Sequence, residues 1–311
     1  MKYLILGGAG FLGAWITKTI LAEKENSVII FDKERADFSK LNPNENLEFQ
    51  SGDFREFSHF DKLVQDCDVV IHLISTTTPA TIDNSIAREI DENIKPTTRL
   101  LEACGRAKVK KFVFISSGGT VYGKQESNSP IKESNATNPI SLYGFQKLMI
   151  EKAIEVFHHS LGLDYKILRL SNPYGPLQNP LSGQGVISAF TYRIIKGMPI
   201  KLFGKGDVIR DFIYVQDAIE MIMNTIKCEK SGTLYNIGTG IGYSINQILK
   251  IIESLVKKKA NIEYCNERPS DIPVNILDIS KYLSEVSNVP PRPIEEGIGL
   301  LIKYFLNEML Q

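Results

Sequence analysis

The feature that most constrains the fold is a glycine-rich segment between a short apolar run and a helical pattern. Residues 3–6 are apolar, glycines follow at Gly7, Gly10 and Gly13, and the helical pattern extends from Ala14 to Ala22. Gly7 permits a tight turn, Gly10 lets the backbone approach a pyrophosphate, and Gly13 allows close helix–strand packing. Because the free N–H groups at the start of a helix attract anions, this segment predicts a dinucleotide-binding site.

A carboxylate follows at the distance that such a site requires. The apolar run at residues 28–31 ends in Asp32, about 20 residues past the glycines. A carboxylate there binds the adenosine ribose hydroxyls and repels a 2′-phosphate, so NAD is expected rather than NADP, even with Lys33 and Arg35 nearby. Asp53 follows the next predicted strand and is placed to meet the adenine.

Apolar runs and helical patterns alternate as far as residue 171. Strands are predicted at 47–50, 69–73, 112–115 and 165–170, and helices at 57–65, 86–104 (closed by Gly105) and 142–161 (closed by Gly162). This alternation predicts an α/β fold with a doubly wound (Rossmann) parallel sheet. Polar segments at 74–80 and 116–123 follow two of the strands, at the edge where such sheets bind ligands. His72 lies inside an apolar strand and is interpreted as a core histidine.

Beyond Ser171, residues that break regular structure become frequent, which predicts a second, smaller lobe. Helices are expected at 186–196 (closed by Gly197), from near 217, at 245–256 (capped by Ser244) and near 294–310, and strands at 200–203 and 234–237. The strand at 234–237 should return to the first sheet. We expect an NAD-binding domain of residues 1–171 that also receives about 211–239. Residues 172–210 and 240–311 should form a C-terminal substrate-binding lobe.

Charge and cysteine content argue against several classes of partner. Lysine plus arginine and aspartate plus glutamate balance at 36 each, so nothing favours nucleic acid or an anionic membrane. The four cysteines have neither disulfide nor metal-ligand spacing, which suits a reducing cytosol and predicts no metal site. No apolar run approaches the roughly 18 residues of a spanning helix, and the N-terminal run is interpreted as a strand rather than a signal peptide. A soluble, cytoplasmic protein is expected.

Tyr143 and Lys147 lie four residues apart in a predicted helix. Positions i and i+4 share a helix face, so the phenol and the ammonium can point into the same space. A nearby ammonium, together with any positive cofactor ring, lowers the pKa of a tyrosine from its usual value of about 10. Tyr143 is therefore a candidate general base, although most such pairs are a half-buried tyrosine beside a solvated lysine.

Together these segments resemble the extended short-chain dehydrogenase/reductases, and within them the NAD-dependent nucleotide-sugar epimerases typified by UDP-glucose 4-epimerase. The resemblance runs nearly from end to end. It rests on the motifs Gly7-x-x-Gly10-x-x-Gly13, Asp32, Gly52-Asp53, Ser116-Ser117…Val121-Tyr122-Gly123, Tyr143-x-x-x-Lys147, Arg169-x-x-Asn172-x-Tyr174-Gly175-Pro176, Arg210-Asp211, Asn236-Ile237-Gly238-Thr239-Gly240 and Arg268-Pro269-x-Asp271.

The resemblance implies an enzyme that inverts C4 of a UDP-sugar through a transient 4-keto intermediate. Tyr143 would take the proton of the 4-hydroxyl while C4 passes hydride to NAD⁺, and Lys147 would hold the nicotinamide ribose. NAD contacts are implied also for Phe11, Leu12, Asp53, Phe54, Leu73, Asn93, Ser116 and Leu170, and substrate contacts for Asn172, Arg210, Arg268, Asp271 and Asn275. Family members usually form a homodimer, here through helices 86–104 and 142–161.

Two positions depart from the family pattern, and a third bears on the choice of sugar. The usual catalytic Ser/Thr, three residues before Val121, is Gly118, so Thr120, or less favourably Ser117, must supply the hydroxyl. Pro96 replaces a glycine in the motif that begins at Asn93, and a proline inside a helix removes a hydrogen bond and kinks it. In the family, the residue seven positions after the equivalent of Arg268 borders the sugar pocket: a tyrosine restricts it to plain hexoses, and smaller residues admit N-acetyl groups. Here that residue is Asn275, which predicts that UDP-GlcNAc and UDP-GalNAc are accepted alongside UDP-glucose and UDP-galactose.

Other functions share part of this pattern. Nucleotide-sugar dehydratases carry an Asp-Glu pair beside the catalytic threonine and decarboxylases a glutamate, whereas this chain has Gly118-Gly119-Thr120. A nucleotide-sugar reductase using NAD(P) is the main alternative, with a dehydratase behind it, and Asp32 counts against NADP. A non-catalytic NAD-sensing protein is a remote alternative, because such proteins usually lose the tyrosine or the lysine.

Overall fold

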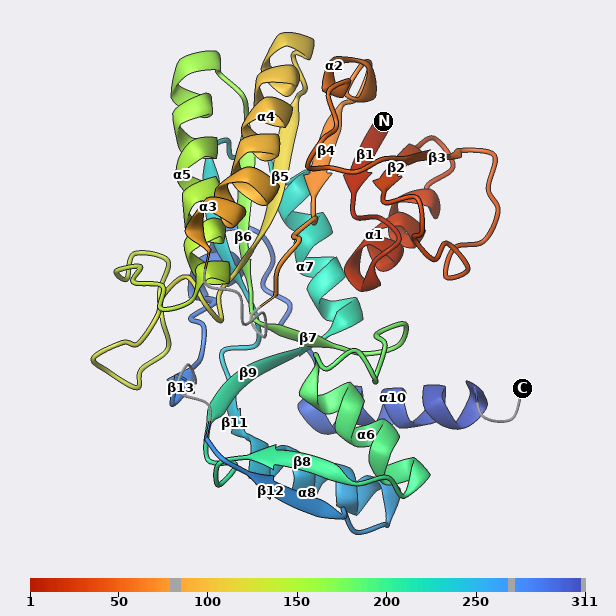
Figure 1. The fold of residues 1–311 in the computed structure, drawn as a ribbon, viewed down its shortest axis with the longest axis vertical. Helices are drawn as coiled ribbons and strands as arrows, with labels where there is room; N and C mark the ends of the chain where they lie inside the picture. The colour runs from red at the N-terminus through yellow and green to blue at the C-terminus, as the bar shows by residue number, and fades with distance from the viewer. Residues whose placement is uncertain (79–84, 268–271, 309–311) are drawn as a thin grey trace.

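The computed structural model describes residues 1–78, 85–267 and 272–308. Its larger part is built on seven strands: β1 (Lys2–Leu6), β2 (Ser27–Asp32), β3 (Leu47–Ser51), β4 (Val69–His72), β5 (Lys111–Ser117), β6 (Tyr165–Leu170) and β10 (Thr233–Ile237). They form one parallel sheet in the order β10-β6-β5-β4-β1-β2-β3 (Figure 1). This confirms the predicted doubly wound α/β fold, and β10 returns to the first sheet as expected.

Helices cover both faces of this sheet. One face carries α1 (Phe11–Leu21), α7 (Val215–Lys227) and α9 (Ser280–Glu285), and the other carries α2 (Phe60–Leu63), α4 (Lys95–Ala107) and α5 (Leu142–Leu161). Successive side chains of a strand point to opposite faces, so Ile5 packs under α1 while Leu4 and Leu6 join the other cluster. The strands are therefore nearly continuous apolar runs, as expected for a parallel sheet covered on both sides.

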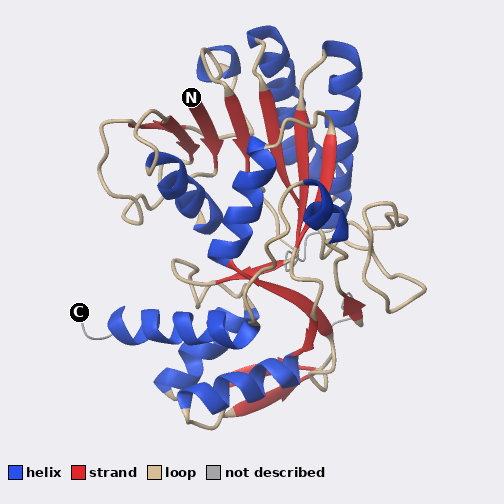
Figure 2. Cartoon of the chain, turned by 180° about the vertical axis from the view of Figure 1, so that it is seen from behind, coloured by secondary structure: helices blue, strands red, loops and turns tan. Residues whose placement is uncertain are grey.

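A second lobe lies beyond the carboxyl ends of the strands, at the lower end of Figures 1 and 2. Its strands are β7 (Asn172–Tyr174), β9 (Ile209–Tyr214), β11 (Gly242–Ser244) and β13 (Val274–Asn275), which form one sheet, and β8 (Ile200–Phe203), which pairs with β12 (Ile262–Cys265). The helices α6 (Val186–Lys196), α8 (Ile245–Val256) and α10 (Ile294–Glu308) share one apolar cluster. The exact division of the chain into two domains stays a prediction.

Several predicted helix ends are confirmed. Gly162 and Gly197 follow α5 and α6 in the left-handed conformation, with φ of 69° and 68°. Ser244 caps α8 through a capping box with Gln247. The helix predicted at 57–65 is shorter in the structure, where only the four residues of α2 form regular α-helix.

The long helix predicted at 86–104 is interrupted. It consists of α3 (Ile86–Glu89), a π-helical turn η1 (Ile90–Ile94), and α4. The hydrogen-bond pattern changes just before Pro96, which lies in the first turn of α4, where a missing N–H costs little. The prediction that Gly105 closes the helix was wrong: α4 continues to Ala107, and a Cβ on Gly105 would lie 2.6 Å from Leu161 Cδ1 of α5.

Within the described residues, no helix has the length and apolarity needed to cross a membrane.

Candidate active site

The glycine segment joins β1 to α1 and leaves room beside the helix start. Gly7 has a φ of 87°, and a Cβ on Gly13 would lie 2.4 Å from the Gly7 carbonyl oxygen. The N-cap of α1 is Gly10, which has no side chain to bond the first N–H groups of the helix that Phe11 and Leu12 begin. These groups can therefore donate to a diphosphate.

Asp32 lies at the end of β2, beside the same segment. Its Oδ2 accepts a hydrogen bond from the Ala9 N–H at 3.1 Å, and its Oδ1 accepts from the Lys33 N–H at 2.9 Å. These two bonds hold the carboxylate next to the glycine segment. That is the position from which a carboxylate binds adenosine ribose hydroxyls.

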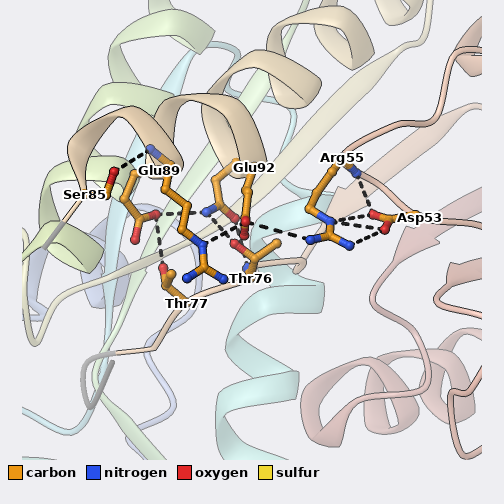
Figure 3. A network of polar contacts seen from close by, with 9 residues as sticks. Asp53, Arg55, Thr76, Thr77, Ser85, Glu89 and Glu92 are labelled. Atoms are coloured by element: carbon orange, nitrogen blue, oxygen red, sulfur yellow. Dashed lines mark hydrogen bonds and ion pairs between the residues drawn. The ribbon is translucent and has the colours of Figure 1, made fainter. Parts of the chain in front are cut away.

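On the predicted adenine side, Asp53 belongs to a polar network (Figure 3). Its carboxylate accepts bonds from the Arg55 side chain, among them one at 2.5 Å from Nη2 and one at 2.9 Å from Nε, which hold the pKa of Asp53 below its usual value. Arg55 also lies 3.8 Å from Glu92 of η1. The side chain of Phe54 is buried against Phe60 and His72, so it belongs to the core.

Asn93, at the π-helical turn, anchors the segment that follows β4 and Leu73. Its Oδ1 accepts from the Thr76 N–H at 2.9 Å, and its Nδ2 donates to Thr76 Oγ1 at 2.8 Å and to Glu89 at 2.9 Å. Because its side-chain amide is occupied in this way, Asn93 orients the loop beside the predicted nicotinamide site. Direct contacts of Asn93 and Leu73 with NAD stay predictions.

Lys147 is buried on α5, one turn after Tyr143. Its Nζ donates to the Ile115 carbonyl at 2.9 Å and lies 5.7 Å from the centroid of the Tyr143 ring. Burial lowers the pKa of Lys147 to about 8, and the Glu151 carboxylate opposes this shift. Burial raises the pKa of Tyr143 to about 12. Lys147 alone therefore does not produce the low tyrosine pKa expected from the sequence, because the loss of hydration dominates in the protein by itself.

Gly118 lies in the turn after β5, at a point where a segment distant in the sequence leaves no room for a side chain. Its N–H donates to the Leu170 carbonyl at 2.8 Å, and its carbonyl accepts from Asn275 Nδ2 at 3.0 Å. A Cβ on Gly118 would lie only 2.5 Å from Leu277 Cδ1. Leu277, which the sequence did not single out, thus occupies the space that the usual serine or threonine would need.

Three buried polar atoms around this turn have no hydrogen-bond partner in the described structure: Thr120 Oγ1, Ser171 Oγ and Asn275 Oδ1. Ser171 follows the residue to which Gly118 donates, and Asn275 bonds Gly118 directly. The start of α5 is close, because a Cβ on Gly144 would lie 2.7 Å from the Thr120 carbonyl oxygen. Since buried polar groups are nearly always paired, these three unpaired atoms require an explanation.

The other predicted site residues are placed differently. Ser116 donates its hydroxyl to Glu151 at 2.5 Å, and Leu170 packs its side chain in the core. Asn172 Nδ2 donates to the Asp211 carbonyl at 2.9 Å, and Arg210 Nη1 donates to the Ile272 carbonyl at 2.5 Å. Arg268 and Asp271 lie outside the described residues.

Asp211 is an organising residue that the sequence showed only as part of a motif. Its buried carboxylate accepts from the Thr239 N–H and hydroxyl at 2.9 and 2.8 Å, the Gly240 N–H at 3.1 Å and the Leu277 N–H at 3.3 Å. It thereby ties β9 to the loop after β10 and to Leu277. Two adjacent charged residues, Arg210 and Asp211, within the otherwise apolar strand Ile209–Tyr214 were the available sequence signal.

Comparison with known proteins decides the family. The model of the NAD dependent epimerase/dehydratase family matches residues 3–238. The chain belongs to this family.

Individual relatives have different activities. A dTDP-4-dehydro-6-deoxyglucose reductase of Escherichia coli is 31% identical over 96% of each chain. The structure of UDP-glucose 4-epimerase with UDP-glucose from Thermotoga maritima is 31% identical, with a TM-score of 0.92 and full coverage of both chains. A Bacillus cereus UDP-glucuronic acid 4-epimerase, solved with UDP-glucuronic acid and NAD, is 28% identical, with a TM-score of 0.90 over 99% of this chain and 100% of that one.

As a member of the NAD-dependent epimerase/dehydratase family, the protein is an NAD-dependent enzyme of the extended short-chain dehydrogenase/reductase type. The described residues fit the cofactor. The glycine segment offers free N–H groups for the diphosphate, and Asp32 is held where the ribose hydroxyls would bind. The family thus confirms the cofactor that the glycine spacing and Asp32 predicted.

Proposed function

We propose that the protein is a 4-epimerase that inverts C4 of a UDP-sugar through a transient 4-keto intermediate. The observation that carries this proposal is the cluster of unpartnered polar atoms at Thr120, Ser171 and Asn275, beside the helix that holds Tyr143 and Lys147. A hydroxyl-rich ring in this place could pair those atoms while its C4 hydroxyl meets an acid/base group. The UDP-sugar 4-epimerases among the similar structures support the same conclusion.

Each residue has a defined part in this proposal. When bound, NAD supplies a hydride acceptor that can return the hydride to either face of the sugar. Tyr143 takes the proton of the 4-hydroxyl and later gives it back. Lys147 holds positive charge beside the phenol, and the Thr120 hydroxyl, in preference to that of Ser117, hydrogen-bonds the oxygen on C4. Asn172, Arg210, Arg268 and Asp271 are proposed to bind the UDP part, and Asn275 to border the sugar.

A panel of sugar nucleotides tests the proposal. Purified protein with NAD⁺ should convert UDP-glucose and UDP-galactose into each other without net change in NADH absorbance, because the hydride returns to the same sugar. UDP-GlcNAc and UDP-GalNAc should also interconvert, since Asn275 leaves more room than a tyrosine. Chromatographic separation of the epimers measures both.

The same panel separates the alternatives. UDP-glucuronate and GDP- and dTDP-sugars are included as competing substrates, and reduced cofactors are offered with each. Net consumption of NADH or NADPH would indicate a reductase, the activity named for the similar Escherichia coli protein. Failure of every N-acetyl sugar to turn over would reject the inference drawn from Asn275.

We also propose a homodimer formed through α3, α4 and α5. Several large apolar side chains on these elements are exposed, among them Ile86 (51%), Val156 (63%) and Leu161 (53%). Sedimentation velocity should give a dimer, and Val156→Glu should shift it to a monomer. Leu181→Glu, at a similarly exposed residue (56%) of the second lobe, is the control. A monomeric wild-type protein at micromolar concentration would contradict the proposal.

The cytoplasmic location expected from the sequence stays a prediction.

A further inference from the structure

A buried ion pair lies one helical turn beyond Lys147. Glu151 of α5 is 0% exposed and Arg169 of β6 is 3% exposed. Arg169 Nη2 donates to Glu151 Oε2 at 2.7 Å, and Arg169 Nε donates to Oε1 at 3.1 Å. Ser116 Oγ donates to the same carboxylate at 2.5 Å. The carboxylate is thus fixed by three donors and cannot turn away from its place beside the catalytic helix.

The Glu151–Arg169 pair contacts the same end of β5 as Lys147 does. Lys147 bonds the carbonyl of Ile115, and Glu151 bonds the hydroxyl of the next residue, Ser116. Ser116 of β5 is in register with Arg169 of β6. The guanidinium of Arg169 also lies 4.6 Å from the ring centroid of Tyr122. Two consecutive residues of β5 are therefore hydrogen-bonded by side chains that lie one turn apart on α5.

The titratable and charged groups near Lys147 lie on its own helix and on two strands. Tyr143 and Glu151 share its helix, His72 lies on β4, and Arg169 lies on β6 behind Glu151. Burial lowers the pKa of His72 to about 3, so this ring is neutral. Glu151 raises the pKa of Lys147 against the effect of burial. Without Glu151, Arg169 would be a buried cation without its ion-pair partner, on the strand next to the one that Lys147 bonds.

We propose that Glu151 and Arg169 act as a positioning pair for Lys147, in which the fixed carboxylate keeps Lys147 protonated beside Tyr143. Arg169 in turn holds the carboxylate in this orientation. The pair contacts Ser116, a predicted NAD-binding residue, but not the reacting atoms, and acts through Lys147. The inference rests on the proposed roles of Tyr143 and Lys147 in epimerisation.

The test replaces both charges together. Replacing a buried ion pair by apolar residues of similar size often preserves stability, so Glu151→Met/Arg169→Met should fold and bind NAD. Its Lys147 should lose its proton at a pH lower by about one unit or more, because the carboxylate that favours the ammonium is gone. Carbon-13 NMR of the NAD-bound protein labelled at lysine Cε measures this titration, with Lys147→Met in the same background to identify the signal.

Activity gives a second readout. If turnover requires protonated Lys147, it falls as pH rises through the Lys147 pKa, and in the double variant this fall should move to lower pH. At neutral pH, kcat should drop by about tenfold or more while KM changes little. The ion pair of Asp217 and Arg292 (Arg292 Nη2 to Asp217 Oδ1, 2.8 Å) lies on α7 and before α10. Asp217→Asn/Arg292→Met should leave both readouts unchanged and is the matched control.

An unchanged Lys147 titration in the folded double variant would overturn the proposal. If Glu151→Met/Arg169→Met does not fold, Glu151→Leu/Arg169→Leu takes its place, since it too removes both charges together. It should lower the titration pH of Lys147 in the same direction, and an unchanged titration would again overturn the proposal. The titration needs no substrate, so it judges the pair even if no UDP-sugar is turned over and the proposed function fails.

Discussion

Tyr143→Phe should abolish epimerisation while leaving NAD bound. The substitution removes only the hydroxyl that accepts and returns the proton, and general acid–base groups contribute on the order of 10²–10⁴ in rate. The ring still packs near Lys147, whose Nζ lies 5.7 Å from its centroid, so the fold around α5 should be kept. Turnover is measured by separation of the epimers, and NAD binding by calorimetry.

Tyr192→Phe is a matched control, because Tyr192 packs against Phe305 in the second lobe. It should have close to wild-type activity. If Tyr143→Phe retained more than about a tenth of wild-type kcat, below the smallest loss expected of an acid–base group, the acid/base assignment would be wrong.

Thr120→Ala should lower kcat by roughly 10²–10⁴, with intact NAD binding. Its Oγ1 is buried and has no partner in the described structure, so it is available to bond the oxygen on C4. Ser117→Ala should cost less. Thr120→Ser restores a hydroxyl and should recover most of the activity. Initial rates for each variant at saturating UDP-galactose measure the differences.

The comparison between these variants decides which hydroxyl replaces the one absent at Gly118. A larger loss for Ser117→Ala than for Thr120→Ala would reverse the assignment. Equal, small losses would show that neither hydroxyl relays a proton. Adding a serine at Gly118 is not a useful gain-of-function test, since its Cβ would lie 2.5 Å from Leu277 Cδ1.

The sequence was informative wherever the deciding interaction is local. The spacing of Gly7, Gly10 and Gly13 predicted the turn into α1, and the apolar run before Asp32 predicted where β2 ends. The four-residue spacing placed Tyr143 and Lys147 on one helix, whose bounds were predicted correctly. Backbone geometry and helical periodicity depend on near neighbours, so the residues themselves carry the information.

The sequence misled where distant segments compete for the same space. Gly105 looked like a helix end, yet it is the point where α4 meets Leu161 of α5. The proline at position 96 predicted a disturbed helix but not the form of the disturbance, a π-helical turn, η1, just before it. Whether Arg268 and Asp271 reach the substrate remains a prediction, because they lie outside the described residues.

The sequence by itself determined the fold class, the NAD-binding segment and the pairing of Tyr143 with Lys147. Only the tertiary structure decided the environment of that pair. Leu277, far along the chain, fills the space at Gly118, and Arg169 fixes Glu151 one turn beyond Lys147. Burial also sets the pKa of Tyr143 in the protein alone. Desolvation and packing depend on which segments meet in space, and that is a property of the folded chain rather than of residue spacing.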